Sequence, residues 1–264
     1  FLVASDKSKI FKGVAYGTLF SALITSIIFL IYMFWYLSKY TKITINFAQI
    51  FNLKKIKNIF NINLNIFIRT ILLTFSFLWF TYLGTQIGED FVAANAILIN
   101  LVFLSAFILD AYAFSTEGIV GYSLGKKDLN LFKNIVKNSF ILSSISGLII
   151  SIIFFFTYNL VINLMSDINE IRELSSSYAV WLIILPVISS FCYQFDGIFI
   201  GASQTKELRN AMIFSVFSYL LISILLIKFL FNTGIWISLC IFMILRAVSL
   251  FYYLDKIYLR FRKN

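Results

Sequence analysis

Seven long apolar segments dominate the pattern of hydrophobic and polar positions along the 264-residue chain. A helix that spans a membrane needs about 20 mainly apolar residues. Segments of this kind occupy approximately residues 14–37, 63–84, 92–121, 134–158, 174–200, 208–230 and 235–257. The pattern predicts an all-α, polytopic transmembrane helical bundle.

Composition supports this prediction, because 60% of the residues are hydrophobic and only 13% are charged. Soluble domains are about 45–50% apolar and about 25% charged. The chain has no His, which excludes Ser-His-Asp triads and His-ligated zinc sites. Both cysteines, Cys192 and Cys240, lie inside apolar runs. We therefore expect no enzyme active site, no metal site and no organic cofactor.

Basic residues gather on one side of the predicted membrane. They follow the first, third, fifth and seventh spans: Lys39, Lys42, Lys54, Lys55, Lys57, Lys126, Lys127, Lys133, Lys137, Lys206, Arg209, Lys256, Arg260, Arg262 and Lys263. The opposite side is acidic, with Glu89, Asp90, Asp167, Glu170 and Glu173. Lysine and arginine favour cytoplasmic loops, so the C-terminus is predicted to be cytoplasmic. The excess of positive charge thus reflects membrane topology, and we expect no nucleic-acid partner. Helices that span lipid, with lysines on the cytoplasmic side, indicate an inner or plasma membrane, since outer-membrane proteins are barrels. The abundant Ile, Phe, Asn and Lys suggest an AT-rich bacterial genome, so the location expected is a bacterial inner (plasma) membrane.

The start of the chain predicts a division into two bundles. Seven spans place Phe1 outside the cell, although three lysines follow it and no initiator Met is present. We infer that the natural N-terminus is missing. Residues 1–40 are predicted to be the last helix of a first lobe, and residues 62–264 a second, six-helix lobe. Between them, residues 41–61 mix apolar side chains with lysines, which is typical of a cytoplasmic interfacial helix.

Paired glycines and one proline predict where helices pack or bend. The G-x-x-x-G pairs are Gly13/Gly17, Gly84/Gly88, Gly121/Gly125 and Gly197/Gly201. Such pairs let helix backbones approach closely in lipid. The single proline, Pro186, lies inside a predicted span and should kink it.

Five ionisable residues lie within the predicted spans: Arg69, Asp110, Glu117, Asp196 and Arg246. A charge at the bilayer centre costs about 2.5–3.5 kcal/mol on insertion scales, so such residues normally face a bundle interior and pair with one another. Three acids and two arginines leave one negative charge, which indicates a site that responds to cations. A structural salt-bridge network is the alternative. Tyr193 shares the helix face of Asp196 and would line a polar recess beside it.

Three ordered motifs resemble the multidrug and toxic compound extrusion (MATE) transporter family, and its DNA-damage-inducible F (DinF) branch in particular. Residues 181–212 resemble the tenth helix and the loop after it. Residues 65–70, which include Arg69, resemble the start of the seventh helix. Residues 94–128 resemble the eighth helix and contain Asn95, Asp110, Glu117, Gly121 and Gly125. The opening Gly13-Val-Ala-Tyr-Gly-Thr is similar to the sixth helix.

The resemblance implies a protein of two six-helix lobes around a central cavity, of which this chain holds helices six to twelve. It implies antiport, in which organic, lipophilic cations leave the cell in exchange for protons or sodium ions. The candidates for ion coupling or substrate binding are then Asp196, Asp110, Glu117, Arg69, Arg246, Tyr193 and Asn95, with Gly197, Gly201, Gly121 and Gly125 for helix packing. Arg69 stands roughly where the sodium-coupled branch has a glutamate, which argues against a sodium site of that type in this lobe.

Two other functions remain open. A flippase for lipid-linked saccharides belongs to the same superfamily, but its cavity needs strong positive charge to hold a pyrophosphate, and the spans contain only two arginines. The chain could also be a non-transporting or degenerate half-transporter.

Overall fold

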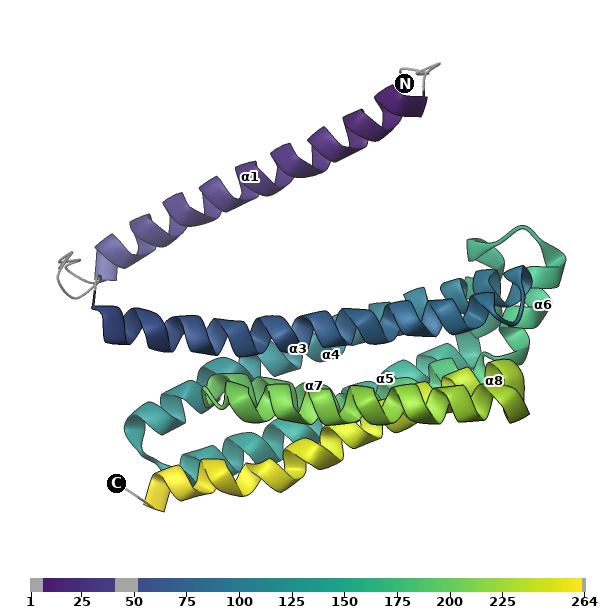
Figure 1. The fold of residues 1–264 in the computed structure, drawn as a ribbon. Coiled ribbons are helices and arrows are strands. Elements are labelled where there is room, and N and C mark those ends of the chain that lie inside the picture. Colours follow the sequence, from purple (N-terminus) through teal and green to yellow (C-terminus); the bar gives the residue numbers. More distant parts are fainter. Residues whose placement is uncertain (1–6, 41–51, 263–264) are drawn as a thin grey trace. The chain divides into compact units, whose positions relative to one another are not determined.

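The computed structural model describes residues 7–40 and 52–262, and every regular element in these residues is a helix (Figure 1). The predicted all-α fold class is therefore confirmed. The elements are α1 (Lys7–Tyr40), α3 (Leu53–Thr85), α4 (Glu89–Lys126), α5 (Leu129–Met165), α6 (Asn169–Ser177), α7 (Val180–Gly201) and α8 (Thr205–Arg262). The chain divides near Ile56 into two compact units, and each is described by itself.

The first unit contains α1, a 34-residue helix that includes the predicted span 14–37. Its apolar side chains are exposed along its length within this unit, and the helix is long and apolar enough to cross a membrane. The predicted interfacial helix falls partly on residues 41–51, which lie outside the described residues. Its later part, from Leu53 onward, forms the first turns of α3.

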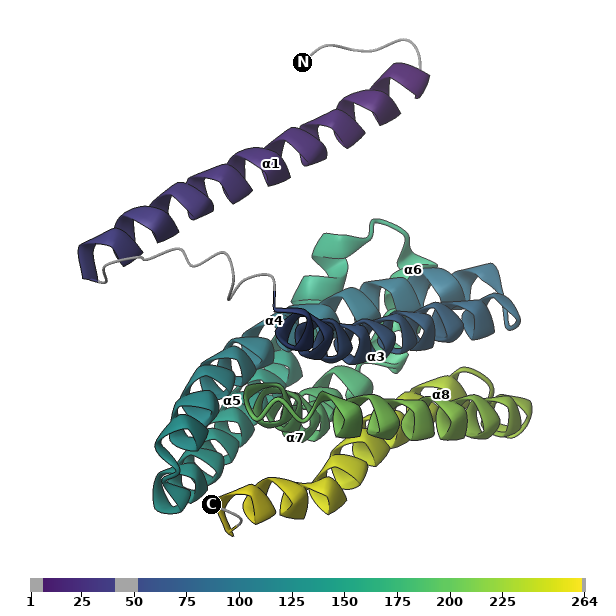
Figure 2. The ribbon, with the colours of Figure 1, turned by 60° about the vertical axis from the view of Figure 1, so that its left-hand side comes forward.

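The second unit is a bundle of antiparallel helices. In the described chain as a whole, six helices, α1 among them, are long and apolar enough to cross a membrane. The last of them, α8, has 58 residues and reverses direction at Phe231, where φ is 47° and ψ is −129° (Figures 1 and 2). The rings of Tyr219 and Phe242 are 5.3 Å apart across the two arms. The predicted spans 208–230 and 235–257 are thus the two arms of one hairpin.

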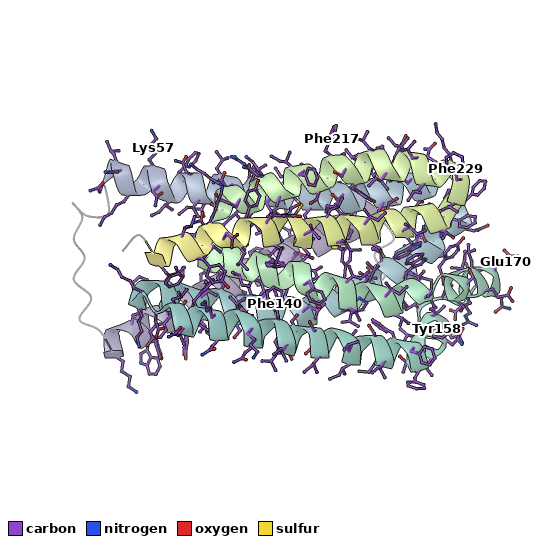
Figure 3. The ribbon with its side chains drawn as sticks, turned by 90° about the horizontal axis from the view of Figure 1, so that it is seen from below. Lys57, Phe140, Tyr158, Glu170, Phe217 and Phe229 are labelled. Carbon is purple, nitrogen blue, oxygen red and sulfur yellow. The ribbon has the colours of Figure 1, made fainter. Side chains whose placement is uncertain are left out.

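One predicted boundary was wrong, because the span expected over residues 174–200 begins at Val180. The preceding residues form α6, a short helix with several polar residues, which ends at Ser177. Backbone hydrogen bonds from Tyr178 and Ala179 to the last carbonyls of α6 separate the two helices. Charged residues in α6 keep it at the end of the bundle, where Figure 3 places Glu170.

At the centre of the bundle, α7 is the most buried span and packs against α4, α5 and α8. It continues through Pro186, whose backbone lies against Gly147 of α5. A Cβ on Gly147 would be 2.8 Å from the Pro186 carbonyl oxygen, so only glycine allows this approach. Proline removes a backbone donor, and the Ser151 hydroxyl supplies a nearby one by donating to the Ile183 carbonyl at 2.6 Å.

The turn from α4 to α5 and the turn from α7 to α8 share one design. Lys127 and Ser203 each have positive φ, at 56° and 54°. The residue after each donates to a carbonyl five residues back, at 3.1 Å and 2.9 Å, which is a Schellman motif. Both turns lie at the same end of the bundle as Lys57, opposite Glu170 and Phe229 (Figures 1 and 3). This end carries many of the chain's lysines.

Candidate ion-coupling and substrate site

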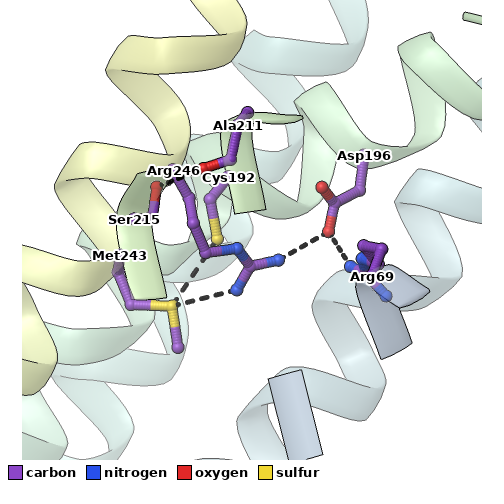
Figure 4. A network of polar contacts seen from close by, with 7 residues as sticks. All are labelled: Arg69, Cys192, Asp196, Ala211, Ser215, Met243 and Arg246. Atoms are coloured by element: carbon purple, nitrogen blue, oxygen red, sulfur yellow. Dashed lines mark hydrogen bonds and ion pairs between the residues drawn. The ribbon is translucent and has the colours of Figure 1, made fainter. Parts of the chain in front are cut away.

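Asp196 joins three helices inside the bundle (Figure 4). Its Oδ2 atom accepts a hydrogen bond from Nη2 of Arg246 on α8 at 2.7 Å. The same oxygen forms an ion pair with Nη2 of Arg69 on α3. Three of the five predicted intramembrane charges therefore form one ion-pair cluster, hereafter the Asp196 cluster.

The Asp196 cluster is deeply buried and carries unused polar atoms. The side chains of Arg246, Asp196 and Arg69 are 1%, 7% and 15% exposed. Removing one partner of such a pair leaves an uncompensated buried charge, which costs about 3–5 kcal/mol. Oδ1 of Asp196 and both arginine Nε atoms are buried without a hydrogen-bond partner in the described part of the chain. The cluster has a net charge of +1 when all three groups are ionised.

Two further carboxylates lie on α4. Asp110 is half-buried and lies close enough to Asp196, Arg69 and Arg246 for their charges to act on it. Glu117 lies two turns further along α4 and is also half-buried. Among the described residues, neither carboxylate has an ion pair or a hydrogen bond through its side chain. An ionised Asp110 would bring the local charge to zero.

Sulfur atoms and aromatic rings surround the buried guanidinium of Arg246. Its Nη1 is 3.4 Å from the sulfur of Met243, and the guanidinium lies 5.5 Å from the centre of the Phe242 ring. The Cys192 thiol is 3.7 Å from the same sulfur. Tyr193, the next residue on α7, is also buried. These side chains make a largely apolar wall on one side of the Asp196 cluster.

Asn95 lies in a different network. Its amide donates to Asn232 Oδ1 at 2.6 Å and accepts from Asn232 Nδ2 at 3.1 Å and from Trp236 Nε1 at 2.9 Å. Asn95 precedes Asp110 by 15 residues on α4, which is about 22 Å along a helix. The structure therefore does not bring Asn95 to the Asp196 cluster, although the motif contains both.

The glycine pair of α7 lies directly against the backbone of α4. A Cβ on Gly197 would be 2.4 Å from the carbonyl oxygen of Ala113, and one on Gly201 would be 2.4 Å from that of Glu117. Gly121 makes an ordinary contact of 3.5 Å with Gly201, and Gly125 has open space around it. Gly197 and Gly201 thus set the distance between α7, which carries Asp196, and α4, which carries Asp110.

Sequence reasoning missed several uncharged polar residues in the bundle. The Thr116 hydroxyl donates to Gln194 Oε1 at 3.0 Å, and the Gln194 amide nitrogen is buried without a partner in the described residues. Asn232 completes the Asn95 network. The sequence contains a signal for such residues, because burying an amide inside an apolar span also costs free energy unless it is hydrogen-bonded.

A bundle of membrane-length helices with an ion-pair cluster in its interior is typical of membrane transporters. Comparison with known proteins agrees with this class. The family model described as MatE matches residues 66–227, which is more than half of the chain. The chain belongs to this family, the MATE family, as the sequence motifs predicted.

A curated relative and two solved structures illustrate the likeness. DNA damage-inducible protein F of Escherichia coli (strain K12) is 32% identical over 189 residues, which are 72% of this chain and 41% of the relative. A crystal structure of MATE in the straight conformation matches with a TM-score of 0.83 at 17% identity, over 96% of this chain and 57% of that one. The bent form of a Vibrio cholerae MATE transporter matches with a TM-score of 0.64 at 18% identity, over 74% and 44%. The chain thus spans about two-fifths of the curated relative's length.

Proposed function

We propose that this chain is part of a secondary-active antiporter that exports lipophilic organic cations in exchange for protons or sodium ions. Family membership and the six membrane-length helices support this function. We place the protein in a bacterial inner membrane with a cytoplasmic C-terminus, on the basis of the basic residues at that end. An N-terminal lobe, which the relatives' greater length suggests, would supply the other wall of the cavity.

One observation supports ion coupling in this lobe most strongly. Two guanidinium groups already neutralise Asp196, whereas the half-buried Asp110 beside them has no ion pair in the described structure. A small cation therefore gains more at Asp110 than at Asp196, because arginines repel it from the latter. Glu117 is the second carboxylate that could take up a cation. Uptake of a cation at either residue would change the charge that α4 presents to the Asp196 cluster. This change would bias the transporter between its two states.

The arginines also help to choose between antiporter and flippase. Arg69 and Arg246 both bind Asp196, so neither remains as a dedicated ligand for a pyrophosphate. A lipid-linked saccharide would have to displace a buried carboxylate to reach them, which costs several kcal/mol. This argument favours export of an organic cation.

Transport by the full-length protein in liposomes would test the proposal. A proton gradient or a sodium gradient is imposed, and the flux of a fluorescent lipophilic cation is followed. We expect one of the gradients to drive uphill flux, and Asp110→Asn to abolish this while downhill exchange of substrate continues. Asp167→Asn is the matched control, because Asp167 is exposed at the Glu170 end of the bundle. Absence of flux under both gradients would overturn the antiporter function, and gradient-driven flux in Asp110→Asn would exclude Asp110 as the coupling residue.

A further inference from the structure

A polar hollow of about 490 Å³ lies where α3 meets the turn between α7 and α8. Side chains that line the interior of a membrane bundle are mostly apolar, but Ile62 is the single apolar residue in this wall. The lining residues are Asn58, Asn61, Ile62, Asn65, Ser203, Gln204, Thr205, Lys206 and Glu207. The hollow is remote in sequence from the carboxylates of α4, and the transport proposal does not use it.

Three asparagines place amide groups along one face of α3. Asn58, Asn61 and Asn65 are spaced by three and four residues, so they share this face. Asn65 is buried and held in place, since it donates to the Thr205 hydroxyl at 3.2 Å and accepts from Nη1 of Arg209 at 2.9 Å. Asn58 and Asn61 are exposed and also line the hollow. Asn65 is thus held by hydrogen bonds, while the amides of Asn58 and Asn61 have no hydrogen-bond partner among the described residues and can donate to a ligand.

The surrounding charge favours an anion. Lys206 belongs to the wall, and Arg209 lies behind Asn65. Lys57 precedes the asparagines by one residue on α3. The acid in the wall, Glu207, is compensated by Lys256, whose Nζ lies 3.1 Å from Oε1. Amide N–H groups beside lysine and arginine side chains are the donors that proteins use for phosphate.

The neighbouring surface indicates that the phosphate is carried by a lipid. Phe60, Leu64 and Phe67 form an exposed apolar stripe on α3, about a third of a turn from the asparagines. The hollow lies at the Lys57 end of the bundle, which the positive-inside pattern assigns to the cytoplasmic leaflet (Figure 3). This leaflet is rich in anionic lipids. A headgroup in the hollow would leave acyl chains free to lie along the apolar stripe.

We propose that this hollow binds the phosphate group of an anionic membrane lipid, and that phosphatidylglycerol is a suitable probe. The proposal concerns α3 and the α7–α8 turn only and is independent of whether the protein transports organic cations. Soluble phosphate has the same recognition chemistry, so the experiment must distinguish the two sources.

The test measures thermal unfolding of the purified full-length protein in detergent during titration with phosphatidylglycerol, with phosphatidylcholine or with inorganic phosphate. Phosphatidylglycerol should raise the melting temperature in a saturable manner. Asn61→Leu and Lys206→Gln should each weaken its apparent affinity by about tenfold, because each removes a donor to a charged group. Both side chains are exposed, so the variants should fold normally, as their lipid-free melting temperatures would verify. Lys127→Gln, exposed at the same end but outside the hollow, should bind like the wild type.

Each outcome decides the proposal. Selective weakening in Asn61→Leu and Lys206→Gln supports a lipid phosphate site. Equal stabilisation by inorganic phosphate, lost in the same variants, overturns the lipid assignment and identifies soluble phosphate. Equal weakening in Lys127→Gln, or unchanged affinity in all variants, overturns the site, because lipid would then respond only to the general positive charge of this end.

Discussion

The contact between α7 and α4 allows a substitution to be predicted quantitatively. Gly197→Ala would place a methyl carbon 2.4 Å from the carbonyl oxygen of Ala113. Carbon and oxygen atoms in such interhelical contacts are normally about 3.3–3.6 Å apart, so the helices would have to separate by about 1 Å. Forcing extra volume into a packed interface costs about 1–3 kcal/mol.

A matched control isolates this cost. Gly118 lies inside α4 with nothing within 4 Å of an added Cβ. Gly118→Ala should therefore raise stability only by the gain from replacing glycine with alanine in a helix, about 0.5–1 kcal/mol. Gly197→Ala has the same gain. The difference between the two variants is the interhelical cost alone.

Thermal unfolding of the two variants in the same detergent measures this difference. For a unit of about 150–250 residues, 1 kcal/mol shifts the melting temperature by about 2–4 °C, so Gly197→Ala should melt roughly 2–12 °C below Gly118→Ala. Adding Ala113→Gly should not rescue it, because the contact is with the backbone of that residue. Equal melting temperatures for the two alanine variants would refute the close approach of these helices.

Further substitutions test the polar networks of the bundle by the same thermal assay. Asp196→Asn should destabilise the protein by about 3–5 kcal/mol, because it leaves the buried Arg69 and Arg246 without a counter-charge, and adding Arg246→Met should restore part of the loss by removing one of these charges; no restoration would argue against the Arg246–Asp196 ion pair. Asn232→Leu should cost about 1–3 kcal/mol by leaving the Asn95 amide unsatisfied, and Asn95→Leu/Asn232→Leu should cost less than the sum of the single changes. Lys256→Gln should change stability by at most about 1 kcal/mol, because the Lys256 side chain is 54% exposed and water screens its ion pair with Glu207; a larger loss would show that the largely buried Glu207 depends on this pair.

Hydrophobicity was sufficient to predict the helices, because a span of lipid demands about 20 apolar residues whatever they pack against. It could not place the start of α7, since the residues before Val180 mix polar and apolar side chains and the backbone hydrogen bonds of Tyr178 decide the break. The reversal at Phe231 falls in the short gap between the last two predicted spans. Hydrophobicity alone could therefore predict which segments are spans, while local hydrogen bonds determine where the helices begin and end.

The candidate site could be predicted only as a set of residues. The expense of burying charge identified Asp196 and both arginines as members of an interior network. It could not show that both arginines bind one oxygen of Asp196, nor that Asp110 is left without an ion pair, because pairing depends on the rotation of each helix about its axis. Asn95 lies on the same helix as Asp110 but belongs to a network about four turns away.

The backbone contacts of α7 limit which helices can move in the transport cycle proposed above. Gly197 and Gly201 hold α7 against α4, and Gly147 holds α5 against it at Pro186. Sliding α7 by one residue, about 1.5 Å, would drive side chains into the carbonyl groups of both neighbours. Spectroscopic labels on α4, α5 and α7 should therefore keep constant distances while the cavity opens and closes. Changes of shape would then occur through α3 and α8, whose contacts with this block include the side-chain pairs Arg69–Asp196, Arg246–Asp196 and Asn95–Asn232.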